Sequence, residues 1–331
     1  CDIVSLGRPL LADPDYVNKL RCGRYDEVRP CISCQEGCMG RIQEYSMINC
    51  AVNPQAARER AMAYEPVLKS KKVMVVGGGV AGCEAARVLA IRGHRPELFE
   101  KGTRLGGNLI PGGAPEFKED DIALADWYAT MLNRLEVPVH LNHEVTKEEV
   151  LAGGYDAVII ATGSKPKTFS LGDDSRVYTA AQVLLKEKDC GDATVVVGGG
   201  LVGCETALWL AQHGRKVTIV EALDKLLAVN GPLCHANKDM LERLVPYHGV
   251  DVITGARVKG YENGVLTAET AEGEKKIPCD SVILAVGYQE ENSLYHQLEF
   301  DVPELYLLGD AKKVSNIMYG IWDAFEVANH I

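Results

Sequence analysis

The chain has 331 residues, of which 47% are hydrophobic and 6% aromatic, so it can bury a large core and divide into two or three domains. Its formal net charge of −11 argues against nucleic acid or an anionic membrane as the main partner, because both require a clustered basic surface. The sequence contains neither an apolar run long enough to span a membrane nor a secretory signal, which predicts a cytoplasmic protein.

The N-terminal segment is predicted to form a short strand over Asp2–Leu6, followed by Gly7 and Arg8 and by a helix from Asp13 to about Leu20. A Gly-Arg pair after a strand suits a phosphate, because the glycine N–H can approach closely and the guanidinium offers two parallel donors. On its own, however, such a pair is more often a surface arginine after a turn.

Four cysteines gather in the next segment. They are Cys31, Cys34, Cys38 and Cys50. Iron–sulfur clusters are typically held by four cysteines, several of them from one tight turn. Structural zinc also accepts four cysteines, but usually as two separated Cys-x-x-Cys pairs, and a set of reduced buried cysteines is a third interpretation. The spacing favours a [4Fe-4S] cluster, around which Gly37 and Gly40 would let the backbone turn tightly.

A linker helix is expected over Asn53–Met62, and Pro66 precedes a β-branched strand, Lys71–Val76. This strand leads into a Gly-x-Gly-x-x-Gly turn, a helix over Cys83–Ile91 and a strand over Leu98–Glu100. These parts, in this order, form the dinucleotide-binding fingerprint. The first glycine makes the turn, the second admits the pyrophosphate, the third packs the helix on the strand, and the acid can bind ribose hydroxyls. The positions are Gly77, Gly79, Gly82 and Glu100.

The same pattern recurs further along the chain. A strand over Ala193–Val197 leads into a second glycine turn, a helix over Cys204–Gln212 and a strand over Val217–Glu221. Each copy is followed by a matching strand, at Asp156–Gly163 and Asp280–Gly287. The second set of fingerprint positions is Gly198, Gly200, Gly203 and Glu221. A regular internal repeat of this kind indicates two nucleotide-binding domains.

Near the C-terminus, a predicted strand over Leu305–Leu308 ends in Gly309 and Asp310, and a helix follows to about Ala328. An aspartate at a strand end can hold a sugar or ribityl hydroxyl while the helix N-terminus faces a phosphate or ring oxygen. An ordinary helix N-cap would explain the aspartate alone. The two fingerprints favour the ligand-binding interpretation.

Together these residues resemble the iron–sulfur flavoenzymes related to 2,4-dienoyl-CoA reductase and 2-enoate reductase, or NADH:flavin oxidoreductases, over essentially the whole chain. In that family an FMN-binding (β/α)8 barrel precedes a four-cysteine cluster loop and a module that binds FAD and NAD(P)H. The resemblance implies an α/β fold: two Rossmann-like, three-layer domains, preceded by a remnant of a TIM barrel and the cysteine loop. The implied divisions are 1–30 for the barrel remnant, 31–65 for the cluster loop and linker, 66–165 with 280–331 for the FAD-binding domain, and 166–279 for the NAD(P)H-binding domain.

The resemblance also assigns cofactor sites. Gly7 and Arg8 match the FMN-phosphate end of the last barrel strand, and the four cysteines fall at the cluster-ligand spacing. The first fingerprint matches the FAD site and the second matches the nicotinamide site. Further flavin-domain signatures are Gly106, Gly107, Ala161, Thr162, Gly163, Gly309 and Asp310. Nearly all of the barrel has no counterpart in this sequence, so no residue that would protonate or orient a substrate can be assigned.

The implied activity passes electrons from NADH through FAD and a [4Fe-4S] cluster to FMN in the barrel, for the reduction of an activated C=C bond in an enoate or enoyl-CoA substrate. A one-electron cluster can connect two flavins that are too far apart for hydride transfer. Glu221 favours NADH over NADPH, because its carboxylate would repel a 2′-phosphate. A small unsaturated substrate is the expected partner, nucleic acid and membrane are not, and self-association into a homo-oligomer stays open.

Three alternatives remain. An amine dehydrogenase of the trimethylamine or histamine type shares this plan, although its third cluster cysteine usually lies one residue closer to the second. A disulfide reductase would require a redox-active cysteine pair beside the flavin, whereas the cysteines of the nucleotide domains are isolated in the sequence. The third alternative is an electron-transfer module without its own substrate site.

Overall fold

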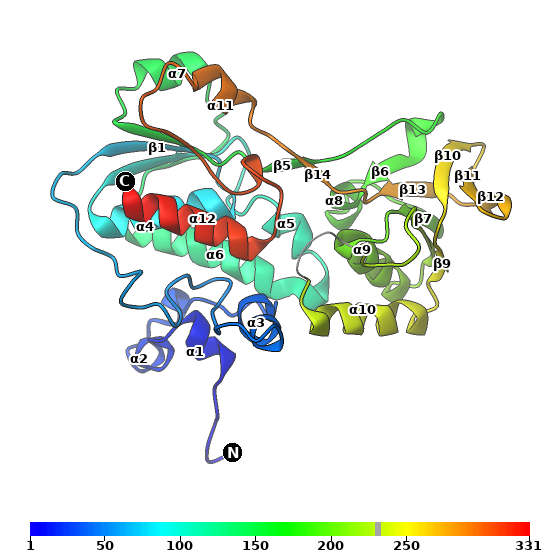
Figure 1. Cartoon of the computed structure of the whole chain (residues 1–331), viewed down its shortest axis with the longest axis horizontal. Coiled ribbons are helices and arrows are strands. Elements are labelled where there is room, and N and C mark those ends of the chain that lie inside the picture. The colour runs from blue at the N-terminus through cyan, green and yellow to red at the C-terminus, as the bar shows by residue number, and fades with distance from the viewer. Residues whose placement is uncertain (229–232) are drawn as a thin grey trace. The chain divides into compact units, whose positions relative to one another are not determined.

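A computed structural model describes residues 1–228 and 233–331 of the chain (Figure 1). The chain divides into two compact units. Unit 1 comprises Cys1–Gly113, Lys118–Ser164 and Glu290–Ile331, and unit 2 comprises Ala114–Phe117 and Lys165–Gln289. Each unit is built on a five-stranded sheet of parallel strands, which confirms the predicted α/β class with two Rossmann-like domains.

The sheet of unit 1 has the strand order β15-β4-β1-β2-β3. The strands are β1 (Lys72–Val76), β2 (Arg95–Phe99), β3 (Val139–His140), β4 (Ala157–Ile160) and β15 (Leu305–Leu307). The apolar run of β1 is buried on both faces, as parallel strands require. Val73 and Val75 pack toward one layer of helices, whereas Met74 and Val76 pack toward the other.

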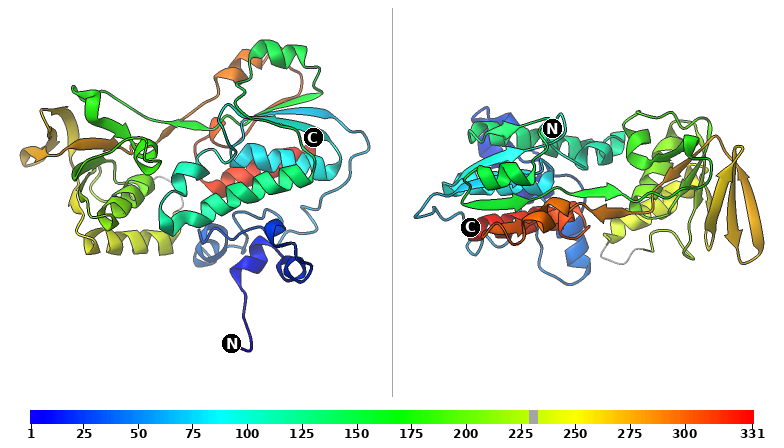
Figure 2. Two further views of the ribbon diagram at one scale, coloured as in Figure 1. Left: turned by 180° about the vertical axis from the view of Figure 1, so that it is seen from behind. Right: turned by 90° about the horizontal axis from the view of Figure 1, so that it is seen from above.

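Helices cover both faces of this sheet. On one face lie α4 (Val80–Arg92), α6 (Glu119–Arg134) and α12 (Ile317–His330), and on the other lie α7 (Lys147–Ala152) and α11 (Ser293–Leu298). The long helices α4 and α12 pack side by side (Figures 1 and 2). The C-terminal segment therefore reaches the helix that follows the first glycine turn.

The sheet of unit 2 has the order β6-β13-β7-β8-β9. Its strands are β6 (Val177–Thr179), β7 (Ala193–Val197), β8 (Lys216–Val220), β9 (Asp251–Ile253) and β13 (Ser281–Leu284). One face packs on α8 (Ala180–Leu184), α9 (Leu201–Gln212) and α10 (His235–Tyr247). The other packs on an antiparallel sheet of β10 (Arg257–Glu262), β11 (Val265–Thr270) and β12 (Gly273–Pro278). Unit 2 therefore has three layers.

The boundary between the units differs from the expected one. Residues 280–331 are predicted from the sequence to belong to the FAD-binding domain, whereas residues 280–289 lie in unit 2. The reason is that β13 pairs with β7 over four residues and also with β6, so it completes the second sheet. Unit 1 resumes at Glu290. The short strands β5 (Ser164–Pro166) and β14 (Tyr288–Glu290) pair where the chain passes between the units.

Two predicted elements are wrong. Residues Asp2–Leu6 form no strand and are mostly exposed, because a single strand needs a partner for its backbone groups and none pairs with it among the described residues. Residues Asn53–Met62 form turns instead of a helix, since Ala57 adopts a left-handed conformation with φ 61°. The remaining short helices are α1 (Arg8–Ala12), α2 (Tyr16–Arg21), η1 (Tyr25–Glu27), η2 (Glu36–Gly40), α3 (Arg41–Gln43), α5 (Leu109–Gly112), η3 (Glu116–Lys118), η4 (Asp174–Arg176) and η5 (Gly309–Ala311).

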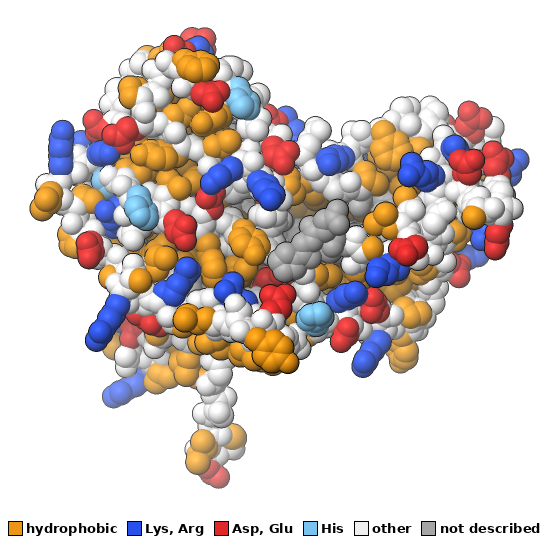
Figure 3. All heavy atoms as spheres, viewed as in Figure 1, with side chains coloured by type: hydrophobic (Ala, Val, Ile, Leu, Met, Phe, Trp, Pro, Cys, Tyr) orange, Lys and Arg blue, Asp and Glu red, His pale blue; other side chains and the backbone are white. Residues whose placement is uncertain are grey.

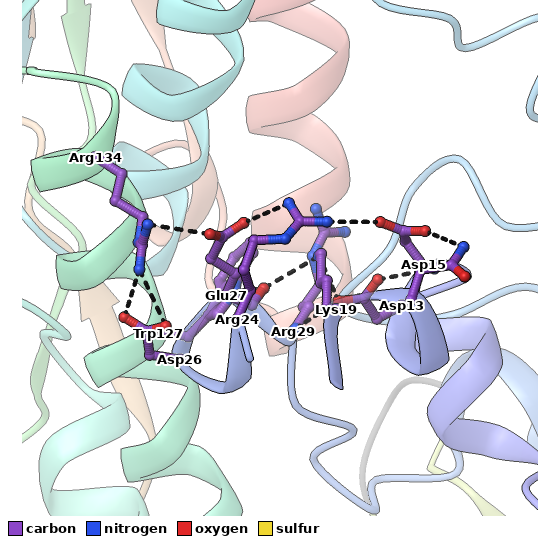
Figure 4. A network of polar contacts seen from close by, with 10 residues as sticks. Asp13, Asp15, Lys19, Arg24, Asp26, Glu27, Arg29, Trp127 and Arg134 are labelled. Atoms are coloured by element: carbon purple, nitrogen blue, oxygen red, sulfur yellow. Dashed lines mark hydrogen bonds and ion pairs between the residues drawn. The ribbon is translucent and has the colours of Figure 1, made fainter. Parts of the chain in front are cut away.

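A polar network holds the N-terminal segment against α6 (Figure 4). Arg134 of α6 contacts Asp26 at 2.8 Å and Glu27 at 3.0 Å. The indole N–H of Trp127, also on α6, donates to the carbonyl of Glu27 at 2.9 Å. Individual exposed ion pairs contribute little, but the buried indole bond and its packing fix the segment that leads into the cysteines.

The surface shows mixed charge. Basic and acidic side chains are interspersed over the face drawn in Figure 3, without a large field of one sign. Within the described residues, no helix combines the length and the apolar character that crossing a bilayer would require.

Candidate cofactor sites

The first glycine turn connects β1 to α4, and two of its glycines have no room for a side chain. Gly77 has φ 109°, and a Cβ there would lie 2.2 Å from the carbonyl oxygen of Ala161. A Cβ on Gly82 would lie 1.9 Å from the carbonyl oxygen of Gly77. Gly79 differs, since nothing lies within 4 Å of its Cβ position. The geometry matches the three roles expected of a dinucleotide-binding turn: a tight bend, an open approach and close helix packing.

Glu100 closes this turn from the end of β2. One carboxylate oxygen accepts the N–H of Gly78 at 2.7 Å, and the other accepts the N–H of Gly102 at 2.6 Å. The thiol of Cys83 donates to the carbonyl of Gly78 at 3.3 Å. Each carboxylate oxygen has a second lone pair, so Glu100 can accept ribose hydroxyls while it holds the turn.

The Gly106-Gly107 segment lies directly on the glycine turn. Gly106 forms a parallel bridge with Gly79, and its N–H donates to the carbonyl of Gly78 at 2.9 Å. A Cβ on Gly107 would lie 3.0 Å from the Cα of Gly79. The two glycines have φ values of 116° and 52°, which are left-handed conformations that favour glycine. A second glycine loop therefore borders the open position at Gly79.

Gly309 and Asp310 approach the same region from the C-terminal segment. A Cβ on Gly309 would lie 2.8 Å from the Cβ of Ala81, which places Gly309 against the first turn of α4. The carboxylate of Asp310 accepts the hydroxyl of Ser164 at 2.9 Å and the N–H of Ser315 at 3.0 Å. Asp310 is thus held by its neighbours and does not act as the side-chain cap of α12, which is Asn316.

The segment Ala161–Gly163 joins these loops. The hydroxyl of Thr162 donates to the carbonyl of Glu291, and the N–H of Glu291 donates to the carbonyl of Gly163 at 2.9 Å. Two further residues here, Ser164 and Asn108, were not predicted from the sequence. The amide of Asn108 donates to the Ser164 hydroxyl at 3.3 Å, which extends the polar chain to Asp310. The only signal in the sequence was that each directly follows a recognised motif.

The second glycine turn, between β7 and α9, repeats this geometry. Gly198 has φ 106°, and a Cβ on Gly203 would lie 1.9 Å from the carbonyl oxygen of Gly198. Gly200 again has nothing within 4 Å. The carboxylate of Glu221 accepts the N–H of Gly199 at 2.5 Å and that of Leu223 at 2.7 Å. The internal repeat in the sequence is therefore a repeat of three-dimensional structure.

All four predicted cluster cysteines line one pocket, which Arg8 also lines. Cys34 lies between two left-handed residues, Ser33 with φ 53° and Gln35 with φ 58°. Cys38 lies in η2, a π-helical turn of a kind that is frequent at functional sites. The predicted phosphate residue Arg8 thus lies at the cysteine pocket, at the start of α1, and Gly7 precedes it.

Gly37 brings the distant Cys50 to this loop. A Cβ on Gly37 would lie 2.9 Å from the backbone nitrogen of Ala51, so the two backbones are in contact. The N–H of Asn49 donates to the carbonyl of Gly37 at 2.7 Å. The indole N–H of Trp322, on α12, donates to the carbonyl of Cys50 at 3.0 Å. These contacts explain how a cysteine separated from Cys38 by eleven residues reaches the same pocket.

Two of the four cysteines lie in surroundings that disfavour the thiolate form when no metal is bound. Burial raises the pKa of the Cys34 thiol to about 12, and burial also raises the pKa of Cys50. Among the described residues, no three His, Cys, Asp or Glu side chains converge on one point closely enough to hold a single metal ion. The donor set of four thiols around a common pocket fits a polynuclear thiolate-bound group, whose binding would release protons.

Comparison with known proteins identifies the fold family. The model of the pyridine nucleotide-disulphide oxidoreductase family matches residues 71–323. The chain belongs to this family. The family's nucleotide-binding fold implies FAD and NAD(P)H as cofactors. Disulfide chemistry does not follow from the family name, because all the cysteines in the matched range are free and buried: Cys83, Cys190, Cys204, Cys234 and Cys279.

Two curated relatives and one solved structure that this chain resembles are reductases. Cinnamate reductase of Clostridium sporogenes is 49% identical over 330 residues, which is 100% of this chain and 50% of that protein. Bilirubin reductase of Mediterraneibacter gnavus is 35% identical over 332 residues, or 99% of this chain and 51% of that protein. A solved structure of 2-naphthoyl-CoA reductase with 2-naphthoyl-CoA has a TM-score of 0.94 and 28% identity, covering 100% of this chain and 50% of that one.

These comparisons confirm the resemblance to 2-enoate-reductase-like oxidoreductases that the sequence motifs indicated. The chain spans about half the length of the curated relatives it matches. The similarity includes residues 1–70, which precede the family match and contain the four cysteines. The similarity to cinnamate reductase therefore covers the cysteine segment in addition to the two nucleotide-binding units.

Proposed function

We propose that this chain is the electron-input part of an NADH-dependent flavin and iron–sulfur oxidoreductase that reduces an activated C=C bond. The observation that carries the proposal is the four-cysteine pocket in the same unit as one of two matched glycine turns. The activities named for two relatives, a cinnamate reductase and a 2-naphthoyl-CoA reductase, support an unsaturated acid or its CoA thioester as the substrate class.

Unit 1 would hold FAD. The open position at Gly79, at the N-terminus of the thirteen-residue helix α4, would receive the pyrophosphate, because unpaired N–H groups and the helix dipole favour an anion there. Glu100 would accept the ribose hydroxyls. Asp310, oriented by Ser164, would face the remaining part of the flavin nucleotide. When bound, the flavin supplies the exchange between two-electron hydride chemistry and one-electron transfer.

Unit 2 would hold NADH in the same manner. Gly200 leaves room for the pyrophosphate, and Glu221 lies at the ribose position, held by the N–H groups of Gly199 and Leu223. A fixed carboxylate at that position disfavours a 2′-phosphate by charge repulsion. This arrangement supports NADH over NADPH.

The cysteine pocket would hold the [4Fe-4S] cluster, with Cys31, Cys34, Cys38 and Cys50 as ligands. Zinc fits less well, because structural zinc usually takes its four cysteines as two separated Cys-x-x-Cys pairs, whereas Cys38 and Cys50 are spread more widely. The FMN-phosphate role of Gly7 and Arg8 stays a prediction that rests on the chemistry of the Gly-Arg pair.

Anaerobic purification followed by absorption spectroscopy and iron and sulfide analysis tests the cofactors. We expect flavin bands and about four iron atoms per chain, the content of one [4Fe-4S] cluster. Flavin without iron, or zinc in its place, would contradict the cluster. Reduction of an artificial acceptor dye by NADH tests the enzyme: FAD-loaded protein that fails to reduce the dye would contradict the electron-input role.

Replacing Glu221 with glutamine tests the nucleotide preference. We expect NADH to give the higher kcat/KM in the parent chain, and E221Q to reduce that preference about tenfold, or ~1.4 kcal/mol, because the charge facing the 2′ position is removed. The measurement is dye reduction with each nucleotide. D224N, which removes an exposed carboxylate from the same loop, is the control and should keep the parent preference. An equal or better kcat/KM for the parent chain with NADPH would overturn the assignment.

A further inference from the structure

Arg29 is a buried cation without an acidic partner. Its residue is 8% exposed, and one guanidinium nitrogen donates to the carbonyl of Val52 at 2.8 Å. The guanidinium carbon lies 4.7 Å from the ring centroid of Trp127. Among the described residues, no carboxylate forms an ion pair with the guanidinium. A buried charge of this kind costs several kcal/mol unless another charge compensates for it.

The neighbouring charges are already paired. Asp13, which accepts the backbone N–H of Arg29, also accepts the ammonium of Lys19 at 2.6 Å (Figure 4). Arg87, whose guanidinium carbon lies 5.7 Å from the Trp127 ring centroid, is paired with the fully buried Glu84 at 2.8 Å. Among the described residues, these pairings leave the guanidinium of Arg29 without an ion-pair partner.

Arg29 contacts the turn that presents Cys50. Val52, which accepts the guanidinium bond, lines the cysteine pocket together with Cys50. The guanidinium therefore lies against the backbone turn that carries Cys50 to the four-cysteine pocket.

We propose that Arg29 compensates the negative charge of a thiolate-bound cluster in the four-cysteine pocket and raises the reduction potential of that cluster. A [4Fe-4S] group with four thiolate ligands is an anion, and one-electron reduction makes it more negative. A fixed buried cation therefore stabilises the reduced form more than the oxidised form. The inference rests on the proposed function for the presence of the cluster, and assigns Arg29 a positioning and electrostatic role rather than a catalytic one.

Three variants of the full chain test this role. R29Q removes the charge, R29K keeps a charge in a smaller donor, and R21Q removes an equal charge from an exposed position on α2. The readouts are iron and sulfide content and the midpoint potential from a redox titration followed by electron paramagnetic resonance. At a fixed solution potential, we expect R29Q to lower the ratio of reduced to oxidised cluster at least tenfold, which is 59 mV for a one-electron couple.

R29K should retain most of the parent potential, and R21Q all of it, since water and salt screen an exposed charge. An R29Q protein that holds its iron at the parent potential would overturn the inference. If R29Q folds but loses its iron, R29K decides the test. An R29K protein that holds its iron at the parent potential supports the charge role. A folded R29K protein that also loses its iron contradicts that role. A parent chain without iron would instead refute the proposed function, which separates the two failures.

Discussion

Replacing Cys34 with serine is expected to abolish binding of the proposed cluster while leaving flavin binding intact. Cys34 lines the pocket, and the left-handed residues on either side of it shape the turn that presents it there. A serine hydroxyl is a harder and far less acidic ligand than a thiol, and it binds iron in such clusters poorly. We expect iron to fall from about four atoms per chain to well below one, by elemental analysis and the loss of the cluster absorption.

Cys22→Ser is the matched control, because Cys22 is exposed, lies at the end of α2 and is not among the residues that line the pocket. It should keep the parent iron content. Flavin content should be unchanged in both variants, since the FAD site is built from the sheet and glycine loops of unit 1. A C34S protein that retains its iron and sulfide would show that Cys34 is not a ligand.

The rate of NADH-dependent dye reduction by the same variants distinguishes loss of the cluster alone from destabilisation of the whole of unit 1. Dyes that accept electrons directly from the flavin need only the two nucleotide-binding units, so C34S should retain most of that activity. Loss of flavin-linked dye reduction together with the iron would instead mean that the cysteine loop stabilises unit 1 as a whole. A contact that would couple the cysteine loop to unit 1 is the hydrogen bond that the indole N–H of Trp322, on α12, donates to the carbonyl of Cys50.

The nucleotide-binding elements could be predicted because their causes are local. The β-branched run of β1 favours a buried strand, and Gly82 is dictated by its contact with Gly77 within one strand–turn–helix unit. The predicted strand Asp2–Leu6 failed because a strand also needs a pairing partner. The predicted helix over Asn53–Met62 failed because long-range bonds hold these residues in turns, such as that from Asn53 to the carbonyl of Leu11 at 2.8 Å.

The same distinction applies to the candidate sites. The glycines, the two acids and the four cysteines carry recognisable spacing, so the sequence indicated them. Ser164, Asn108 and Arg29 have no such spacing, and their importance comes from partners far along the chain, such as Asp310 for Ser164 and Val52 for Arg29. The boundary at residue 280 was misplaced for a related reason, since only strand pairing shows which sheet β13 completes.

The second large effect is expected for Gly82→Ala. This substitution should abolish FAD binding because it disrupts the fold of the glycine turn. The added Cβ would lie 1.9 Å from the carbonyl oxygen of Gly77, and both groups belong to backbone that is fixed by β1 and α4. Relief requires the helix to move away from the strand, at a cost of about 3 kcal/mol or more for such overpacking. The measurements are thermal unfolding of the flavin-free protein and titration with FAD.

Gly79→Ala provides the contrast within the same turn. Gly79 has φ −72°, and nothing lies within 4 Å of its Cβ position, so the flavin-free protein should lose no more than about 1 kcal/mol, the usual cost of alanine at a helix N-cap. FAD affinity should nevertheless fall, because the methyl group would occupy the approach of the pyrophosphate. Wild-type FAD affinity in G79A would show that the cofactor does not use this opening.

The repeat supplies an internal check on both substitutions. Gly203 and Gly200 have the same surroundings in unit 2 as Gly82 and Gly79 have in unit 1. G203A should therefore destabilise unit 2 and G200A should weaken NADH binding, with FAD content unchanged in G200A. If G200A lowered FAD content while NADH binding stayed at the parent level, the assignment of the two cofactors to the two units would have to be exchanged.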